Sequence, residues 1–448
     1  MISFSVYSGR MTVVVELSNT SPQHVGDLEQ LSKASTVSEP VAITTGPYWQ
    51  MAYYAVSGFL FWGLLMIQIP FIDGYFGGPG VIFYITFSYG LASNVIRVVL
   101  VWYGNRTKKS IAVQMTALIN FGGAFTGLTM IAFPVAMTIL GRDNGNISFW
   151  ICIVLTSFMG IFNSLLMNAG FGLMSMAPEK SASFFLLGQT MTGVFTWPII
   201  VGLRAIVNAL GGGDETDYIV AVMSLSLSGL ITMGTIPLYK LKTRHHPVFS
   251  HMLAPYQTPT GSPSNNPRRS RPIKAVFKSI WVPASASWIS CLFTFAVFPS
   301  QVSLWQPSFT DALYDGPLFR SFLIYVYSIA DTIGRMLPRL LHVLLSVTDR
   351  TFLTATVVRG IVFVPLMLLS SLKAPELFAL DWWRLILIIV FGITNGTNFG
   401  LANMLAPRRV DACDKMHVGT ILSFTAINGL FVGSLIGIGL KHAFPIHS

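Results

Sequence analysis

The sequence predicts an all-helical integral membrane protein with about eleven transmembrane helices in a six-plus-five arrangement. The first observation is composition: 52% of the 448 residues are hydrophobic and 10% are charged, whereas a soluble domain carries about 25% charged residues. The second is that apolar runs of about 20 residues, long enough to cross a bilayer, recur along the chain after residue 47. The third is that most of the net charge of +10 falls in one segment, as expected for a loop on one side of a membrane.

The predicted elements follow the apolar runs in order. Residues 1–47 are polar and mixed, lack the features of a cleavable signal peptide, and predict a disordered cytoplasmic tail. Residues 48–240 hold the first six helices, residues 241–279 form a basic cytoplasmic loop rich in Pro and Ser, and residues 280–448 hold the last five. The helices are expected at about 49–72, 81–103, 111–140, 149–176, 183–210, 218–239, 280–302, 318–345, 352–372, 382–405 and 418–440.

The basic loop sets the predicted orientation. Residues 240–278 contain eight Lys and Arg and no acidic residue, so they supply +8 of the net charge of +10. Because Lys and Arg collect in cytoplasmic loops, we place this loop and the N terminus in the cytoplasm. An odd number of helices then puts the C terminus outside. Since the charge excess is local and reports topology, the expected partner is the lipid bilayer and not a nucleic acid.

Two opposite charges lie near the middle of the predicted eighth helix. Asp331 and Arg335 are four residues apart, so their side chains share one helical face with Tyr327, one turn earlier. A charge at the centre of a bilayer costs about 2.5–3.5 kcal/mol on insertion scales. We interpret the pair as lining the path of a solute, because ionisable residues inside membranes usually mark such paths. The alternative is an ion pair that only fixes helix packing.

Other predicted helices carry polar side chains that could line a cavity with this pair. They are Gln68, Asn163, Gln189 and Asn395. Each one alone is most often an interhelical hydrogen bond, but together they suit a neutral solute rich in hydrogen-bonding groups. No catalytic or phosphate-binding motif accompanies them, and the three cysteines are best explained as packing residues. We therefore predict no enzyme activity, no cofactor and no metal site.

At these residues the chain resembles the equilibrative nucleoside transporter family (SLC29-like), with variants similar to its protozoan, kinetoplastid branch. The resemblance covers most of residues 48–440. Its strongest point is Asp331-Thr-Ile-Gly334-Arg335, which matches the family's D-x-x-G-R. The other matching segments are Val297-Phe-Pro299, Gly188-Gln-Thr-Met-Thr-Gly193, Thr394-Asn-Gly396, Ala406-Pro-Arg-Arg-Val410, Gly419-Thr-Ile-Leu-Ser-Phe424 and Gly429-Leu-Phe.

This resemblance implies a major-facilitator-like fold without its last helix, working by alternating access. It also implies that Asp331 and Arg335 bind the sugar and neighbouring base atoms of a nucleoside. Phe298 and Pro299 would then lie at an extracellular gate, with Pro70 of the first helix opposite.

Two departures from the family concern the base-facing side of the pocket. The family's Leu-Pro-Trp-Asn in the first helix is replaced here by Leu64-Leu-Met-Ile-Gln-Ile-Pro70. A Gln that contacts the base in animal members falls at Met167, near Asn163. The choice between nucleoside and free nucleobase, and between bases, therefore stays open.

The expected function is secondary transport of purine or pyrimidine nucleosides or nucleobases, equilibrative or coupled to a co-transported proton. We expect the protein in the plasma membrane. One alternative is a major-facilitator transporter of another neutral polar solute, such as a sugar, which would carry a twelfth helix and an acidic loop motif after its second. A membrane-embedded enzyme is the other alternative, and it would need a cluster of catalytic side chains at a membrane face.

Overall fold

The computed structural model describes most of the chain, which divides into two units, residues 1–45 and 46–448. The described residues are 2–7, 10–15, 46–68, 81–106, 111–140, 145–253, 271–299, 301–308, 316–341, 346–372 and 376–443.

The first unit contains two short paired strands. Strands β1 (Ile2–Tyr7) and β2 (Arg10–Val15) are antiparallel, with Ile2 opposite Val15. Serines alternate with Ile2, Phe4 and Val6 in β1, a pattern that favours a strand. The structure thus pairs these two segments where we predicted a disordered tail, because that prediction weighed polarity and not alternation. Residues 16–45 lie outside the described part of the chain.

The second unit is built of helices. Those before the basic loop are α2 (Tyr48–Ile67), α4 (Val81–Arg106), α5 (Ile111–Leu140), α6 (Gly145–Met176), α7 (Glu179–Ala209), α8 (Thr216–Met233) and α9 (Thr235–Leu238), then a π-helical turn at Tyr239–Thr243 and α10 (Pro247–Leu253). Those after it are α11 (Ile273–Val297), α12 (Gly316–Leu340), α13 (Asp349–Leu372), α14 (Asp381–Leu405) and α15 (Lys415–Ala443). Single 3-10 turns occur at Gly213–Glu215, Val302–Leu304, Glu376–Ala379, Ala406–Arg409 and Ala412–Asp414.

The long helices have the lengths that membrane spans require. Within the described residues, ten helices are long and apolar enough to cross a bilayer. They do not include α12, which has 25 residues but carries four charged side chains, Arg320, Asp331, Arg335 and Arg339. The helical membrane fold of residues 46–448 is therefore confirmed, while α12 as an eleventh span, and the orientation of both termini, stay predictions.

Several long helices contain a proline. In α11 the backbone leaves helical geometry at Ile280 (φ −118°, ψ 16°), three residues before Pro283. A proline ring crowds the preceding turn and removes a backbone donor, which accounts for the kink. Such breaks are tolerated within a helical bundle because neighbouring helices satisfy the freed backbone groups.

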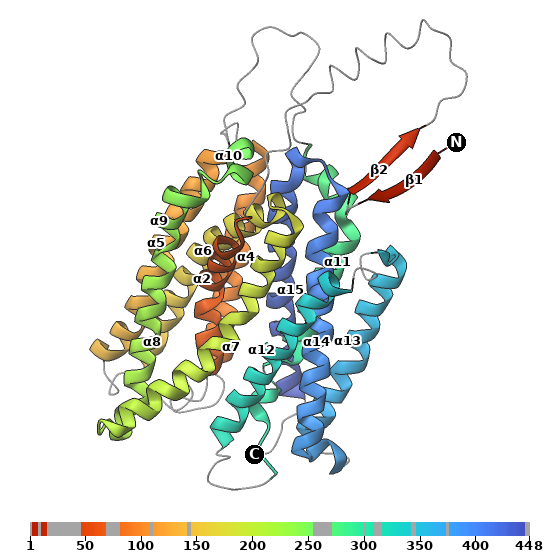
Figure 1. The fold of residues 1–448 in the computed structure, drawn as a ribbon. Helices are drawn as coiled ribbons and strands as arrows, with labels where there is room; N and C mark the ends of the chain where they lie inside the picture. Colours follow the sequence, from red (N-terminus) through yellow and green to blue (C-terminus); the bar gives the residue numbers. More distant parts are fainter. Residues whose placement is uncertain are drawn as a thin grey trace, which may run out of the picture. The chain divides into compact units, whose positions relative to one another are not determined.

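The helices before and after the basic loop form two groups that meet along a few contacts. In Figure 1 the earlier helices, orange to green, lie together on the left, and the later helices, green to blue, lie on the right. α7 packs against α12, and α15 packs against α4 and α6. Within the later group, α12 packs against α14, and α11 packs against α15. The polar residues of both groups meet between these helices.

Candidate functional site

A cavity of about 160 Å³ lies between the two groups of helices. Residues of α2, α4, α6, α7, α11, α12, α14 and α15 line it, so both groups contribute. Since a buried water needs roughly 10–15 Å³, the cavity has room for on the order of ten waters. Most of the polar residues predicted from the sequence face it: Asn163, Gln189, Tyr327, Asp331, Arg335 and Asn395.

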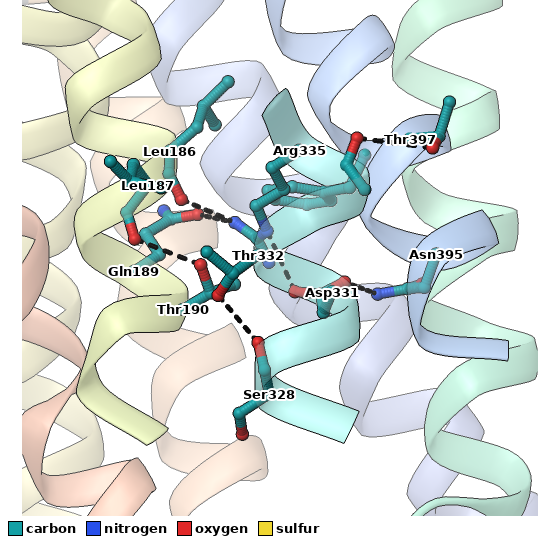
Figure 2. Close-up of polar contacts among 12 residues, drawn as sticks. Leu186, Leu187, Gln189, Thr190, Ser328, Asp331, Thr332, Arg335, Asn395 and Thr397 are labelled. Atoms are coloured by element: carbon teal, nitrogen blue, oxygen red, sulfur yellow. Dashed lines mark hydrogen bonds and ion pairs between the residues drawn. The ribbon is translucent and has the colours of Figure 1, made fainter. Parts of the chain in front are cut away.

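The charged pair lines this cavity, and Figure 2 shows its contacts with Gln189 and Asn395. Arg335 Nε donates to Asp331 Oδ2 at 2.9 Å, and the two side chains are only 10% and 4% exposed. Asn395 Nδ2 of α14 donates to the other carboxylate oxygen at 2.8 Å. Arg335 Nη1 donates to Gln189 Oε1 of α7, and its guanidinium carbon lies 4.5 Å from the ring centroid of Phe399. The pair therefore joins three helices and also faces the cavity.

Close approach of α12 and α14 places Asp331 beside Asn395. A Cβ atom on Gly396 would overlap the carbonyl oxygen of Asp331, and one on Gly334 would overlap that of Ile393. Both contacts would be far closer than van der Waals distance, so only glycine permits the two backbones to approach this closely. The glycine of the D-x-x-G-R segment thus has a packing role that sets the position of the charges.

A second arginine, Arg359, stabilises this wall although it does not line the cavity. Asn395 Oδ1 accepts hydrogen bonds from Ser290 Oγ (3.0 Å) and Thr294 Oγ1 (2.8 Å) of α11. Arg359 of α13 is buried, and its Nη2 and Nε donate to Thr294 Oγ1 (3.2 Å) and Thr394 Oγ1 (3.0 Å). Arg359 was not among the predicted site residues, although a lone arginine inside a predicted span indicates a functional network.

The opposite wall comes from α2, α4 and α6. Asn163 Nδ2 donates to the carbonyl oxygen of Gly58 at 3.0 Å and to the hydroxyl of Tyr89 at 2.7 Å. Met167 is buried and lines the cavity one turn after Asn163. Arg97 also lines this wall and donates from Nη1 to Ser423 Oγ of α15. Arg97 was not among the predicted site residues.

Aromatic side chains lie at the end of α11. Phe298 and Pro299 line the cavity directly after this helix, and the ring of Phe298 stacks on Tyr327 with a centroid distance of 4.0 Å. Trp62 of α2 faces Phe295 of α11, with ring centroids 6.0 Å apart. The contact between Trp62 and Phe295 joins the two groups of helices beside the pocket.

Two predicted residues are placed differently. Gln68 does not line the cavity: its Nε2 donates to Ser224 Oγ at 2.7 Å, where α2 meets α8. Its amide serves the helix contact that a single intramembrane amide most often makes. Pro70, the third predicted gate residue, lies outside the described residues.

Comparison with known proteins shows which proteins this chain resembles. A family model described as "Nucleoside transporter" matches residues 254–442. Equilibrative nucleoside transporter 1 of Rattus norvegicus is 22% identical over 347 residues, covering 70% of this chain and 73% of that protein. Equilibrative nucleoside transporter 2 of Homo sapiens is 22% identical over 361 residues, covering 71% and 77%. The sequence of this chain is therefore similar to those of equilibrative nucleoside transporters. These relatives are transporters, which confirms the prediction that the chain is not an enzyme.

A solved structure shows the same type of fold. It is a bacterial homologue of the human lysosomal transporter Spinster in an inward-facing, unoccupied conformation, with a TM-score of 0.51 and 10% sequence identity. The match covers 87% of this chain and 81% of the other. At this identity the likeness concerns the fold alone, and it agrees with the transporter fold predicted from the sequence.

Proposed function

We propose that this chain is an equilibrative nucleoside transporter, which moves nucleosides or nucleobases across a membrane by alternating access. The observation that carries the proposal is the Asp331–Arg335 pair, which is buried within the bundle and yet faces a cavity between its two groups of helices. An ion pair needed only for packing has no reason to lie against such a cavity. In this proposal the pair is retained because a passing solute replaces or extends its hydrogen bonds.

The cavity has groups that suit a nucleoside. Carboxylate oxygens of Asp331 and guanidinium N–H groups of Arg335 can accept from and donate to ribose hydroxyls. Asn163, Met167, Gln189 and Asn395 supply amides and an adaptable apolar side chain nearby. Aromatic rings of Tyr327 and Phe399 offer flat surfaces for a base. We assign Phe298 and Pro299 to a gate beside this site.

We propose that transport is driven by the solute gradient alone, as the names of the equilibrative relatives imply. Uptake measured between about pH 5.5 and pH 8, with and without an uncoupler, tests this. We expect no effect of the uncoupler, and a large one would show proton coupling.

Uptake in cells tests the proposed function. The chain is expressed in a purine-auxotrophic host, its presence in the plasma membrane is confirmed by surface labelling, and entry of labelled adenosine, inosine, hypoxanthine and adenine is measured. We expect saturable uptake of at least one, inhibited by excess unlabelled purine but not by glucose. Absence of uptake of every purine and pyrimidine tested, with protein at the surface, would contradict the proposal. Inhibition by glucose would instead favour a sugar transporter.

A further inference from the structure

The cavity contains a buried cation that the proposed site does not use. Arg97 of α4 is 2% exposed and lines the cavity. Its Nη1 donates to Ser423 Oγ, while its Nε has no hydrogen-bond partner among the described residues. Within the part of the chain that the structure describes, no carboxylate forms an ion pair with Arg97. A buried guanidinium without a carboxylate is costly, so a ligand that supplies acceptors would be favoured there.

The charge balance of the cavity supports the same conclusion. Its lining contains the guanidinium groups of Arg97 and Arg335 but only one carboxylate, Asp331. Both oxygens of Asp331 are already bound by Arg335 and Asn395. Arg359 adds a further positive charge behind this wall. The excess positive charge favours a solute whose exposed edge is rich in hydrogen-bond acceptors.

The neighbours of Arg97 supply a complementary acceptor. The Tyr89 hydroxyl interacts with the charge of Arg97 and accepts from Asn163 Nδ2 at 2.7 Å. Asn163 is 2% exposed and lines the cavity, and its Oδ1 has no partner among the described residues. This wall thus combines a guanidinium donor with an amide oxygen that can accept one hydrogen bond.

A 6-oxopurine presents the matching edge. Its O6 and N7 are adjacent acceptors, which arginine recognises in a bidentate manner, and its N1–H is a donor next to O6. A 6-aminopurine presents an amino donor in place of O6, which would face the donors of a guanidinium. The chemistry of this wall therefore distinguishes the two classes of purine.

We propose that Arg97 is a specificity-determining residue that makes this transporter favour 6-oxopurines, such as hypoxanthine and guanine and their nucleosides, over 6-aminopurines. This inference rests on the proposed function. Arg97 binds the O6/N7 edge of the base, Asn163 accepts from N1–H, and the Asp331–Arg335 pair on the opposite wall contacts the sugar. Met66 and Ile67, within the first-helix departure from the family, and Met167 line the same cavity.

Competition binding on the purified full chain tests this without any substitution. Displacement of labelled inosine is measured with unlabelled inosine, adenosine and 7-deazainosine, which lacks the N7 acceptor. One bidentate arginine–base contact discriminates by about 5- to 140-fold. We expect adenosine to compete at least about fivefold more weakly than inosine, and 7-deazainosine to be weakened as well.

The substitution Arg97→Gln tests the assignment to this residue. We expect the ratio of inosine to adenosine affinity to fall about fivefold or more, toward one. The control is Arg204→Gln, which also removes an arginine from a helix, but one that is 45% exposed and paired with Asp217 away from the cavity. It should keep the wild-type ratio.

The outcomes separate this inference from the proposed function. Equal affinity of the wild type for inosine and adenosine, or a preference for adenosine, overturns the inference and leaves nucleoside transport standing. A parallel loss of both substrates in Arg97→Gln overturns it too, because it would assign the residue a structural role. If that variant fails to fold, the wild-type protein decides: weaker competition by 7-deazainosine than by inosine supports the inference, and equal competition overturns it. Absence of any nucleoside or nucleobase binding by the wild type overturns both proposals.

Discussion

At the residue scale, the site depends on the few hydrogen-bonding partners that are available to each buried charge. Asp331 accepts from Arg335 at 2.9 Å and from Asn395 at 2.8 Å, and Arg335 also donates to Gln189. Hydrogen bonds to charged groups contribute about 1.5–3 kcal/mol each, and a buried charge left without its partner costs more. The pair is therefore sensitive to substitutions that change charge or hydrogen-bonding capacity but little volume.

Neutralising either charge should abolish most transport. For Asp331→Asn and Arg335→Ala we expect uptake to fall at least about tenfold, because each removes a charged hydrogen-bonding partner at the cavity wall. Uptake is normalised to protein at the cell surface. The matched control is Asp217→Asn, which breaks the exposed Arg204–Asp217 pair, whose side chains are 45% and 39% exposed. Wild-type uptake in both test variants would show that the pair only stabilises the packing of the helices.

A substitution behind the cavity wall should have an intermediate effect. Arg359 contacts Thr294, which in turn binds the acceptor oxygen of Asn395. For Arg359→Gln we expect an increase of about tenfold in the apparent KM, since loss of this support lets Asn395 move away from Asp331. Uptake as a function of substrate concentration measures it. An unchanged KM with normal surface expression would show that Arg359 does not position the site.

The sequence predicted one part of this site well and another part poorly. Asp331 and Arg335 could be paired because their spacing of four residues fixes their relation within one helix. The contacts of Asp331 with Asn395, and of Arg335 with Gln189, join residues at least 64 positions apart, so they depend on helix packing that periodicity does not give. For the same reason Gln68 was predicted to face the cavity although its amide contacts α8.

At the element scale, the position of α12 against α14 depends on glycine. The two helices approach so closely that a Cβ on Gly396 would overlap the carbonyl oxygen of Asp331. The sequence indicated small residues in both helices, but it could not show that they face each other or that one of them adjoins Asp331. It also gave the first and last residues of the helices only approximately, as the start of α11 at Ile273 instead of Ile280 illustrates.

Gly396→Ala should therefore destabilise the protein and impair binding. Overpacking a tight contact costs about 1–3 kcal/mol, and the required shift of α14 would also move Asn395. We expect a lower midpoint of thermal aggregation in detergent and weaker binding of labelled nucleoside. Gly202→Ala in α7 is the control, since a Cβ there meets nothing within 4 Å. A wild-type midpoint in Gly396→Ala would contradict the close packing of the two helices.

At the scale of the whole molecule, an ion pair connects the two groups of helices at one end. Arg408, after α14, donates from Nε and Nη2 to the two carboxylate oxygens of Glu179 at the start of α7, at 2.5 Å and 2.6 Å. A second exposed pair, Arg409 with Asp349, lies entirely within the later group. Alternating access requires contacts between the groups to break and reform, so only the first pair should affect that equilibrium.

Glu179→Gln should favour opening at this end. Exposed pairs contribute at most about 1 kcal/mol, which corresponds to about a fivefold shift in population. The rate at which a cysteine introduced at Ala177 reacts with a thiol reagent measures the opening, and Asp349→Asn is the matched control. We expect faster reaction for Glu179→Gln only. Equal rates in both variants would show that the Glu179–Arg408 pair does not hold the groups together.

The central claim, that a solute binds beside Asp331 and Arg335, is tested most directly by protection of a cysteine in the cavity. Ser328 lines the cavity one turn before Thr332 on α12, and the native Cys291 also lines it. The measurement is the reaction rate of Ser328→Cys with a small methanethiosulfonate reagent, in a Cys291→Ser background, with and without nucleoside. We predict that the introduced thiol reacts and that saturating inosine slows the reaction at least about fivefold, whereas glucose does not. A thiol that reacts at the same rate with and without every nucleoside and nucleobase tested would contradict this account.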